Sequence, residues 1–245
     1  MKISFVGTVG PQFLEIRDRL GRTPLIYAVF GDKEVAVDFL LKAGARLESH
    51  DMFGRTALHY IAHKACSFEY SQCGCVLNSV FVSQDRNQPL KAILSRIGSS
   101  KALISALTCS DSEGTTPIHL ATKHTNCKVL GVLLKKMSAE AAHVDIQDQA
   151  KRTPLHWACL HGNSKAVGML LSHGANGGIS DIEGKTPLHW ACDSHSNAKD
   201  REAIKCITSI LVSILQRVGK FSIFSSSLRL TDLVIIFGCR RKAHR

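Results

Sequence analysis

A four-residue motif recurs five times along this 245-residue chain, and it limits the possible folds more than any other feature of the sequence. The motif reads TPLI at Thr23, TALH at Thr56, TPIH at Thr116, and TPLH at Thr153 and Thr186. Successive copies begin 33, 60, 37 and 33 residues apart, and an Asp stands five residues before each Thr. A recurring period of this length indicates supersecondary units that stack on one another.

Each position of the motif has a mechanical interpretation. Thr can cap the start of a helix, and Pro is tolerated in the first turn because no intrahelical donor is lost there. His can bond the Thr hydroxyl or a neighbouring backbone group, and so tie one repeat to the next. A Gly after a leucine pair, as at Gly44, supplies the left-handed end of a second helix. A 33-residue period that carries T-P-L-H is the ankyrin-repeat signature.

The sequence therefore predicts an all-α ankyrin-repeat solenoid of about five helix–turn–helix repeats with hairpin loops, each unit burying its faces against its neighbours. The predicted array spans 18–211, with repeats near 18–50, 51–110, 111–147, 148–180 and 181–211. Helices are expected near 24–30, 34–42, 57–64, 90–105, 117–123, 127–136, 154–161, 164–172, 187–193 and 200–215.

Three segments depart from the repeat pattern. The second repeat carries a long insertion at about 66–88, which we interpret as a surface loop or an unexcised intron rather than a functional insertion. Residues 1–17 form an irregular N-terminal segment, and 212–245 form a non-repeat basic tail. These departures suggest a fragment or imperfect version of a longer array.

Composition narrows the class of protein further. The net charge is +11, but only 6% of residues are aromatic and no Gly-rich RNA signature is present, so we expect no nucleic-acid binding. No apolar run reaches the length of a membrane span, and the start lacks a convincing signal peptide. The nine cysteines are scattered without a disulfide framework, which favours a cytoplasmic location.

Neither catalysis nor metal binding is predicted. The sequence contains no Gly-rich phosphate loop, no nucleophile in a recognisable context and no paired carboxylates outside the repeat pattern, so we expect no enzyme, no catalytic residues and no cofactor. The one cluster with zinc-like chemistry is His59, His63, Cys66, Cys73 and Cys75. We disfavour it because the repeat motif already uses His59 and the cysteines lie in the insertion.

A basic surface is the candidate partner-binding site. The residue before the motif Thr is basic in four of five repeats, and more basic residues follow the first helices. The candidate set is Arg19, Arg22, Arg55, His63, Lys64, Lys123, His124, Arg152, His161 and Lys185. This pattern predicts an acidic partner surface that associates faster at low salt, although Arg or Lys is also common here as an ordinary solvated residue. Trp157 and Trp190 follow the motif His, where core packing is favoured over a role as partner anchors.

Features beyond the consensus narrow the resemblance. Residues 18–59, 114–158 and 175–207 resemble the inversin family of ciliary ankyrin-repeat proteins, also called nephrocystins, including a longer loop around 137–143 and the His-Trp pair at His189. The resemblance implies a scaffold that organises a ciliary compartment, with nephrocystins and Dishevelled as partners and a role in Wnt and planar polarity signalling. It also implies a cilium or cytoskeleton location. Calmodulin binding in that family uses motifs that this chain does not contain.

Two functions stay open at this point. The first is a non-enzymatic protein–protein interaction scaffold of the inversin type. The alternative is a generic cytosolic ankyrin-repeat adaptor with unrelated partners.

Overall fold

The computed structural model describes residues 10–64, 93, 101–123, 127–139, 143–193 and 200–217. Every regular element within these ranges is a helix, and one isolated bridge joins His50 and Thr56. The all-α class predicted from the sequence is therefore confirmed. None of the described helices combines the length and the apolar character needed to cross a membrane.

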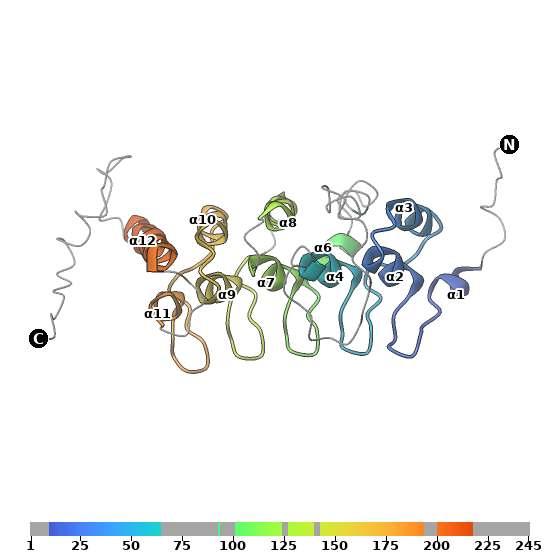
Figure 1. Ribbon diagram of the computed structural model, residues 1–245, viewed down its shortest axis with the longest axis horizontal. Helices are drawn as coiled ribbons and strands as arrows, with labels where there is room; N and C mark the ends of the chain where they lie inside the picture. The colour runs from blue at the N-terminus through green and yellow to red at the C-terminus, as the bar shows by residue number, and fades with distance from the viewer. Residues whose placement is uncertain are drawn as a thin grey trace, which may run out of the picture.

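The helices fall into two rows (Figure 1). The inner row contains α2 (Pro24–Phe30), α4 (Ala57–Lys64), α7 (Pro117–Thr122), α9 (Pro154–Leu160) and α11 (Pro187–Cys192). The outer row contains α3 (Glu34–Lys42), α8 (Lys128–Ala139), α10 (Ser164–Ser172) and α12 (Asp200–Arg217). Two more helices are α1 (Pro11–Leu14), before the first hairpin, and α6 (Lys101–Thr108), which contacts α7 and α8.

Consecutive inner helices contact one another, and hairpins project from this row along one edge of the stack (Figure 1). The motif explains why each inner helix begins where it does. At α9, for example, Thr153 is the N-cap, Pro154 occupies the first turn, and His156 completes a reciprocal capping box with the Thr153 backbone. The same box is present at α7 and α11.

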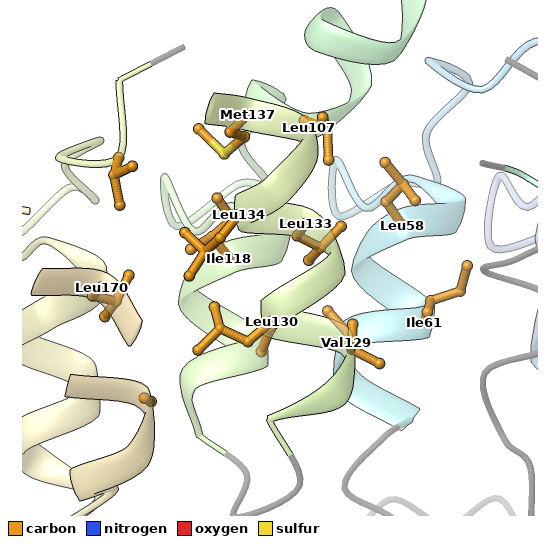
Figure 2. Packing of buried hydrophobic residues seen from close by; sticks show 14 of the residues in the cluster. Leu58, Ile61, Leu107, Ile118, Val129, Leu130, Leu133, Leu134, Met137 and Leu170 are labelled. Carbon is orange, nitrogen blue, oxygen red and sulfur yellow. The ribbon is translucent and has the colours of Figure 1, made fainter. Parts of the chain in front are cut away.

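The core runs between the two rows. One face of α8 is entirely buried because its apolar residues recur every three or four positions. These residues are Val129, Leu130, Leu133, Leu134 and Met137. Figure 2 shows them beside Ile118 of α7, with Leu58 and Ile61 of α4 on one side and Leu170 of α10 on the other. Each fully buried leucine of this kind contributes about 2 kcal/mol of transfer free energy to folding.

Outside the second repeat, the helix boundaries agree with the sequence expectations to within three residues. For the predicted helix 90–105, Ile93 is helical and α6 runs from Lys101 to Thr108, three residues past the predicted end. The predicted start at 90 lies outside the described residues. The insertion at about 66–88 lies outside the described residues, as does 218–245. Helix α12 continues to Arg217, past the predicted end of the array at 211.

Candidate interaction surface

The Asp five residues before each motif Thr builds the hairpin turn. In the second hairpin, the backbone N–H groups of Phe53 and Arg55 both donate to Asp51 Oδ1, each at 2.8 Å. Asp18, Asp111 and Asp181 accept the equivalent pair of bonds. An Asp side chain that bonds the backbone two residues ahead is a standard way to stabilise a turn. In the fourth hairpin, Asp148 accepts the second bond of this pair, from the N–H of Arg152 at 2.8 Å.

In four of the five hairpins, the second carboxylate oxygen of the Asp also accepts a hydrogen bond from a side chain. Asp148 Oδ2 accepts from Arg152 Nε at 2.9 Å and from the indole N–H of Trp157 at 3.0 Å. In the same way, Asp181 accepts from Trp190 at 2.8 Å. The other two bonds are Tyr60 Oη to Asp51 Oδ2 at 2.7 Å and Arg22 Nε to Asp18 Oδ2 at 2.9 Å. The hairpin and its inner helix are therefore held together by side chains.

In four of the five repeats, the residue before the motif Thr is basic and lies over an aromatic ring. Arg22 lies 4.4 Å from the centroid of Tyr27, and Arg55 lies 4.7 Å from that of Phe53. Further along the array, Arg152 lies 5.4 Å from Trp157 and Lys185 lies 5.5 Å from Trp190. Cation–π contacts of this kind contribute roughly 0.5–1 kcal/mol each at exposed sites. The third repeat has neither partner, because it carries Thr115 and Leu120 at these positions.

The tryptophans match the sequence expectation only in part. Both are only half-buried, and their indole N–H groups point to the hairpin carboxylates. Trp190 packs against the core, as expected, with its polar tip on the hairpin. The signal was present in the sequence, since Asp and Trp are nine residues apart in both repeats, but hydrophobic periodicity does not register a polar tip on an apolar side chain.

The remaining candidate residues lie either at a hairpin tip or at the C-terminal ends of inner helices. Arg19 is exposed at the first hairpin tip, and Lys64 ends α4. His63, Lys123 and His161 follow or end inner helices of three consecutive repeats. Burial, and after it the charge of Lys123, lowers the pKa of both His63 and His161, that of His161 to about 4. These three side chains therefore share one electrostatic environment, while His124 lies outside the described residues.

Part of the basic charge is already neutralised within the array. Arg22 pairs with Asp18 at 2.8 Å, and Arg152 pairs with Asp148 at 2.9 Å. Lys185 pairs with Glu183 at 2.6 Å. Although partial burial raises the pKa of Asp18, hydrogen bonds from Arg22 and the turn lower it to about 2, so this carboxylate stays ionised. Two of the candidate arginines therefore also stabilise their own hairpins.

In three repeats the motif histidine joins its repeat to the next, as the sequence predicted. His119 Nδ1 accepts from the Thr116 backbone N–H at 3.2 Å, and Nε2 lies 3.0 Å from the carbonyl oxygen of Arg152. A carbonyl only accepts, so the proton is on Nε2. His59 and His156 make the same bonds to the carbonyls of Thr115 and Lys185. These histidines are therefore structural and neutral.

Acid is expected to weaken the array through these histidines. Burial lowers the pKa of His119 to about 4, against about 6.5 in an unfolded chain. Between these values the unfolded chain binds the extra proton, so the free energy of unfolding falls as pH falls and is unaffected by this group above pH 6.5. His119 alone should cost about 2 kcal/mol between pH 6.5 and 5. Urea unfolding at a series of pH values measures this slope, and a constant stability from pH 7 to 5 would contradict it.

Within the described ranges, no three His, Cys, Asp or Glu side chains are arranged to hold a metal ion. In the disfavoured zinc cluster, both ring nitrogens of His59 are hydrogen-bonded: Nδ1 accepts from the N–H of Thr56, and Nε2 donates to the carbonyl of Thr115. Cys66, Cys73 and Cys75 lie outside the described residues.

Comparison with known proteins agrees with this architecture. A family profile described as ankyrin repeats (three copies) matches residues 136–208, and a single ankyrin repeat profile matches 20–52. An ankyrin repeat domain from Acinetobacter baumannii shares the fold, with a TM-score of 0.60 and 20% identity over 82% of this chain and 86% of that one.

Inversins are similar in sequence over a long stretch. Inversin of Gallus gallus is 41% identical over 194 residues, and those of Mus musculus and Homo sapiens are 38% identical over the same length. The match covers 79% of this chain but only 15% of each inversin. The chain therefore has an ankyrin-repeat fold, and it is consistent with the N-terminal ankyrin region of inversin.

Proposed function

We propose that this chain is a non-enzymatic scaffold that organises signalling proteins in a ciliary compartment and acts in Wnt and planar polarity signalling. The ankyrin repeats and the similarity to inversin support a protein-interaction scaffold in general terms. The observation that carries the finer proposal is the identity of 38–41% to inversins over 79% of the chain. By the same resemblance, the proposed partners are nephrocystins and Dishevelled, and the proposed location is the cytoplasm and the cilium.

The proposed mechanism is rigid presentation of the basic surface to an acidic partner. Two observations support it. One basic residue stands directly before the motif Thr in four repeats: Arg22, Arg55, Arg152 and Lys185. The charge of Lys123 also acts on His63 and His161 in the neighbouring repeats. Because Arg22 and Arg152 also hold their own hairpins, the mechanism is tested at Arg55 and Lys123, whose replacement leaves those two hairpin bonds in place. Positive potential of this kind speeds association more than it raises affinity.

Charge reversal at these two positions tests the mechanism. The association rate of purified Dishevelled with Arg55→Glu/Lys123→Glu is expected to fall about tenfold at low salt, because electrostatic steering is lost. The control is Lys135→Glu/Lys165→Glu, which changes the net charge equally but on exposed positions of α8 and α10. Biolayer interferometry at several salt concentrations gives both rates. Equal rates for the two variants would dispose of the basic-surface mechanism.

Location tests the ciliary part of the proposal. A fluorescently tagged chain in ciliated epithelial cells is expected to concentrate in the cilium relative to the tag alone. An even distribution through the cytoplasm would favour the generic adaptor instead.

A further inference from the structure

An apolar patch lies at the tips of the first two hairpins. Leu20 is 40% exposed, Met52 is 62% exposed and Phe53 is 41% exposed. These three residues, here called the tip patch, occupy the turns where a solvated hairpin ordinarily carries polar side chains. Large apolar side chains that gather on a surface mark interaction sites more often than single ones do.

The tip patch is held rigid by the backbone. The N–H of Met52 donates to the carbonyl of Leu20 at 2.9 Å, so the two tips are joined directly. On the other side, the N–H of Ser112 donates to the carbonyl of Phe53 at 2.8 Å. A surface whose shape is fixed in advance loses little conformational entropy when a ligand binds.

The patch is confined to these two tips. The next hairpin carries Ser112 and Glu113 at the equivalent positions, and the fourth carries Gln149 and Ala150. The fifth carries Ile182, which is 64% exposed and has only the small side chain of Ala150 as an apolar neighbour at the preceding tip. The apolar area therefore suits one or two side chains of a ligand rather than a broad interface.

Positive charge borders the tip patch. The guanidinium of Arg55 lies over the ring of Phe53, and the exposed Arg19 is adjacent to Leu20. Arg17 anchors the patch from the other direction, because its guanidinium donates to the carbonyl of His50 at 3.0 Å and keeps further donors. Arginine forks suit carboxylates in particular, because two N–H groups can bond the two oxygens.

We propose that the tip patch binds a short segment of a partner protein in which a large apolar side chain is flanked by Asp or Glu. This deepens the proposed scaffold function and rests on it, but it uses a surface separate from Lys123. A phospholipid surface also offers negative charge and apolar depth. The segment fits better because Glu113 stands at the next tip, where it would repel an extended anionic membrane.

The probe is a random peptide library displayed on phage and selected on the full chain. Selected peptides are expected to combine a large apolar residue with neighbouring Asp or Glu. Fluorescence anisotropy then compares the best peptide on the native chain and on Met52→Ser/Phe53→Ser, where affinity should fall at least tenfold. Ile182→Ser, the matched control at the isolated tip, should leave affinity within twofold. Both side chains of the double variant are largely exposed, so the array should stay folded and lose only the contact between Arg55 and the Phe53 ring, about 0.5–1 kcal/mol.

Three results would overturn the proposal. One is a failure to select acidic–apolar peptides, and another is equal binding by the native chain and the double variant. The third is that the tip patch binds something other than a peptide. Sedimentation in which only the double variant is monomeric would show that the patch joins two copies of the chain. Binding to phosphatidylserine vesicles that the double variant loses would show that the patch binds a membrane. The scaffold function fails separately, because it is judged by Dishevelled association, whereas peptide binding at the tips does not depend on that partner.

Discussion

Replacing His119 with alanine is expected to lower the free energy of unfolding by about 3–4 kcal/mol. The ring is fully enclosed and bonds two repeats, so its removal leaves the Thr116 backbone N–H without its acceptor. The Thr116 hydroxyl and the Arg152 carbonyl each lose one of two bonds. Buried groups that lose a hydrogen bond cost about 1–3 kcal/mol each, and the cavity adds to this. Urea unfolding followed by circular dichroism measures the loss.

His189→Ala is the matched control for this prediction. His189 makes the same bonds to Thr186, at 3.1 and 2.8 Å, but its ring is exposed, and within the described residues its Nε2 has no bond to a following repeat. Its replacement should cost about 1 kcal/mol, the typical value of a lost helix cap. Equal losses for the two variants would mean that the bond between repeats contributes nothing measurable.

Gly114→Ala is expected to lower the free energy of unfolding by about 3 kcal/mol, from a left-handed backbone cost of about 1–2 kcal/mol and a steric cost of similar size. Gly114 has φ of +75°, and a Cβ there would lie 2.7 Å from the backbone nitrogen of Gln149 in the next hairpin. Backbone cannot rotate away as a side chain can, so the two hairpins must separate. Thermal and urea unfolding both report the change.

Gly184→Ala separates these two causes. Its φ is +76°, so the backbone cost is the same, but a Cβ there meets nothing within 4 Å. The expected loss is about 1–2 kcal/mol, from the left-handed conformation alone. A loss at Gly184 as large as that at Gly114 would show that contact between hairpins is unimportant. Lys151 already adopts φ of +57° at this position of the fourth hairpin, so the conformation itself is tolerated.

The sequence predicted the fold closely because a repeat states its own register five times. Thr and Pro mark the start of each inner helix, and α2, α3, α4 and α10 have the expected bounds. Where the register is interrupted, as before α6, the predicted helix start at 90 lies outside the described residues and stays a prediction. The role of the motif histidine was also predictable, since it stands three residues after the capping Thr, within reach of the Thr hydroxyl and backbone N–H.

The candidate surface was predicted less completely. The sequence indicated that Arg22 and Arg152 recur at one position, but not that each is bound to the Asp four residues before it. Repetition shows which residues are equivalent and does not show which of several nearby charges pair. Likewise, the exposure of Met52 depends on the shape of the turn and the neighbouring tip, neither of which hydrophobic periodicity describes.

The bonds from His59, His119 and His156 to the following repeats also determine how the array opens. Each repeat is coupled only to its immediate neighbours, so a repeat opens more readily when fewer repeats pack beside it. Amide hydrogen exchange should therefore be slowest in α7, which has two inner helices on each side. A ligand at the first two hairpins would slow exchange in α2 and α4 first, because stabilisation passes from one repeat only to the next.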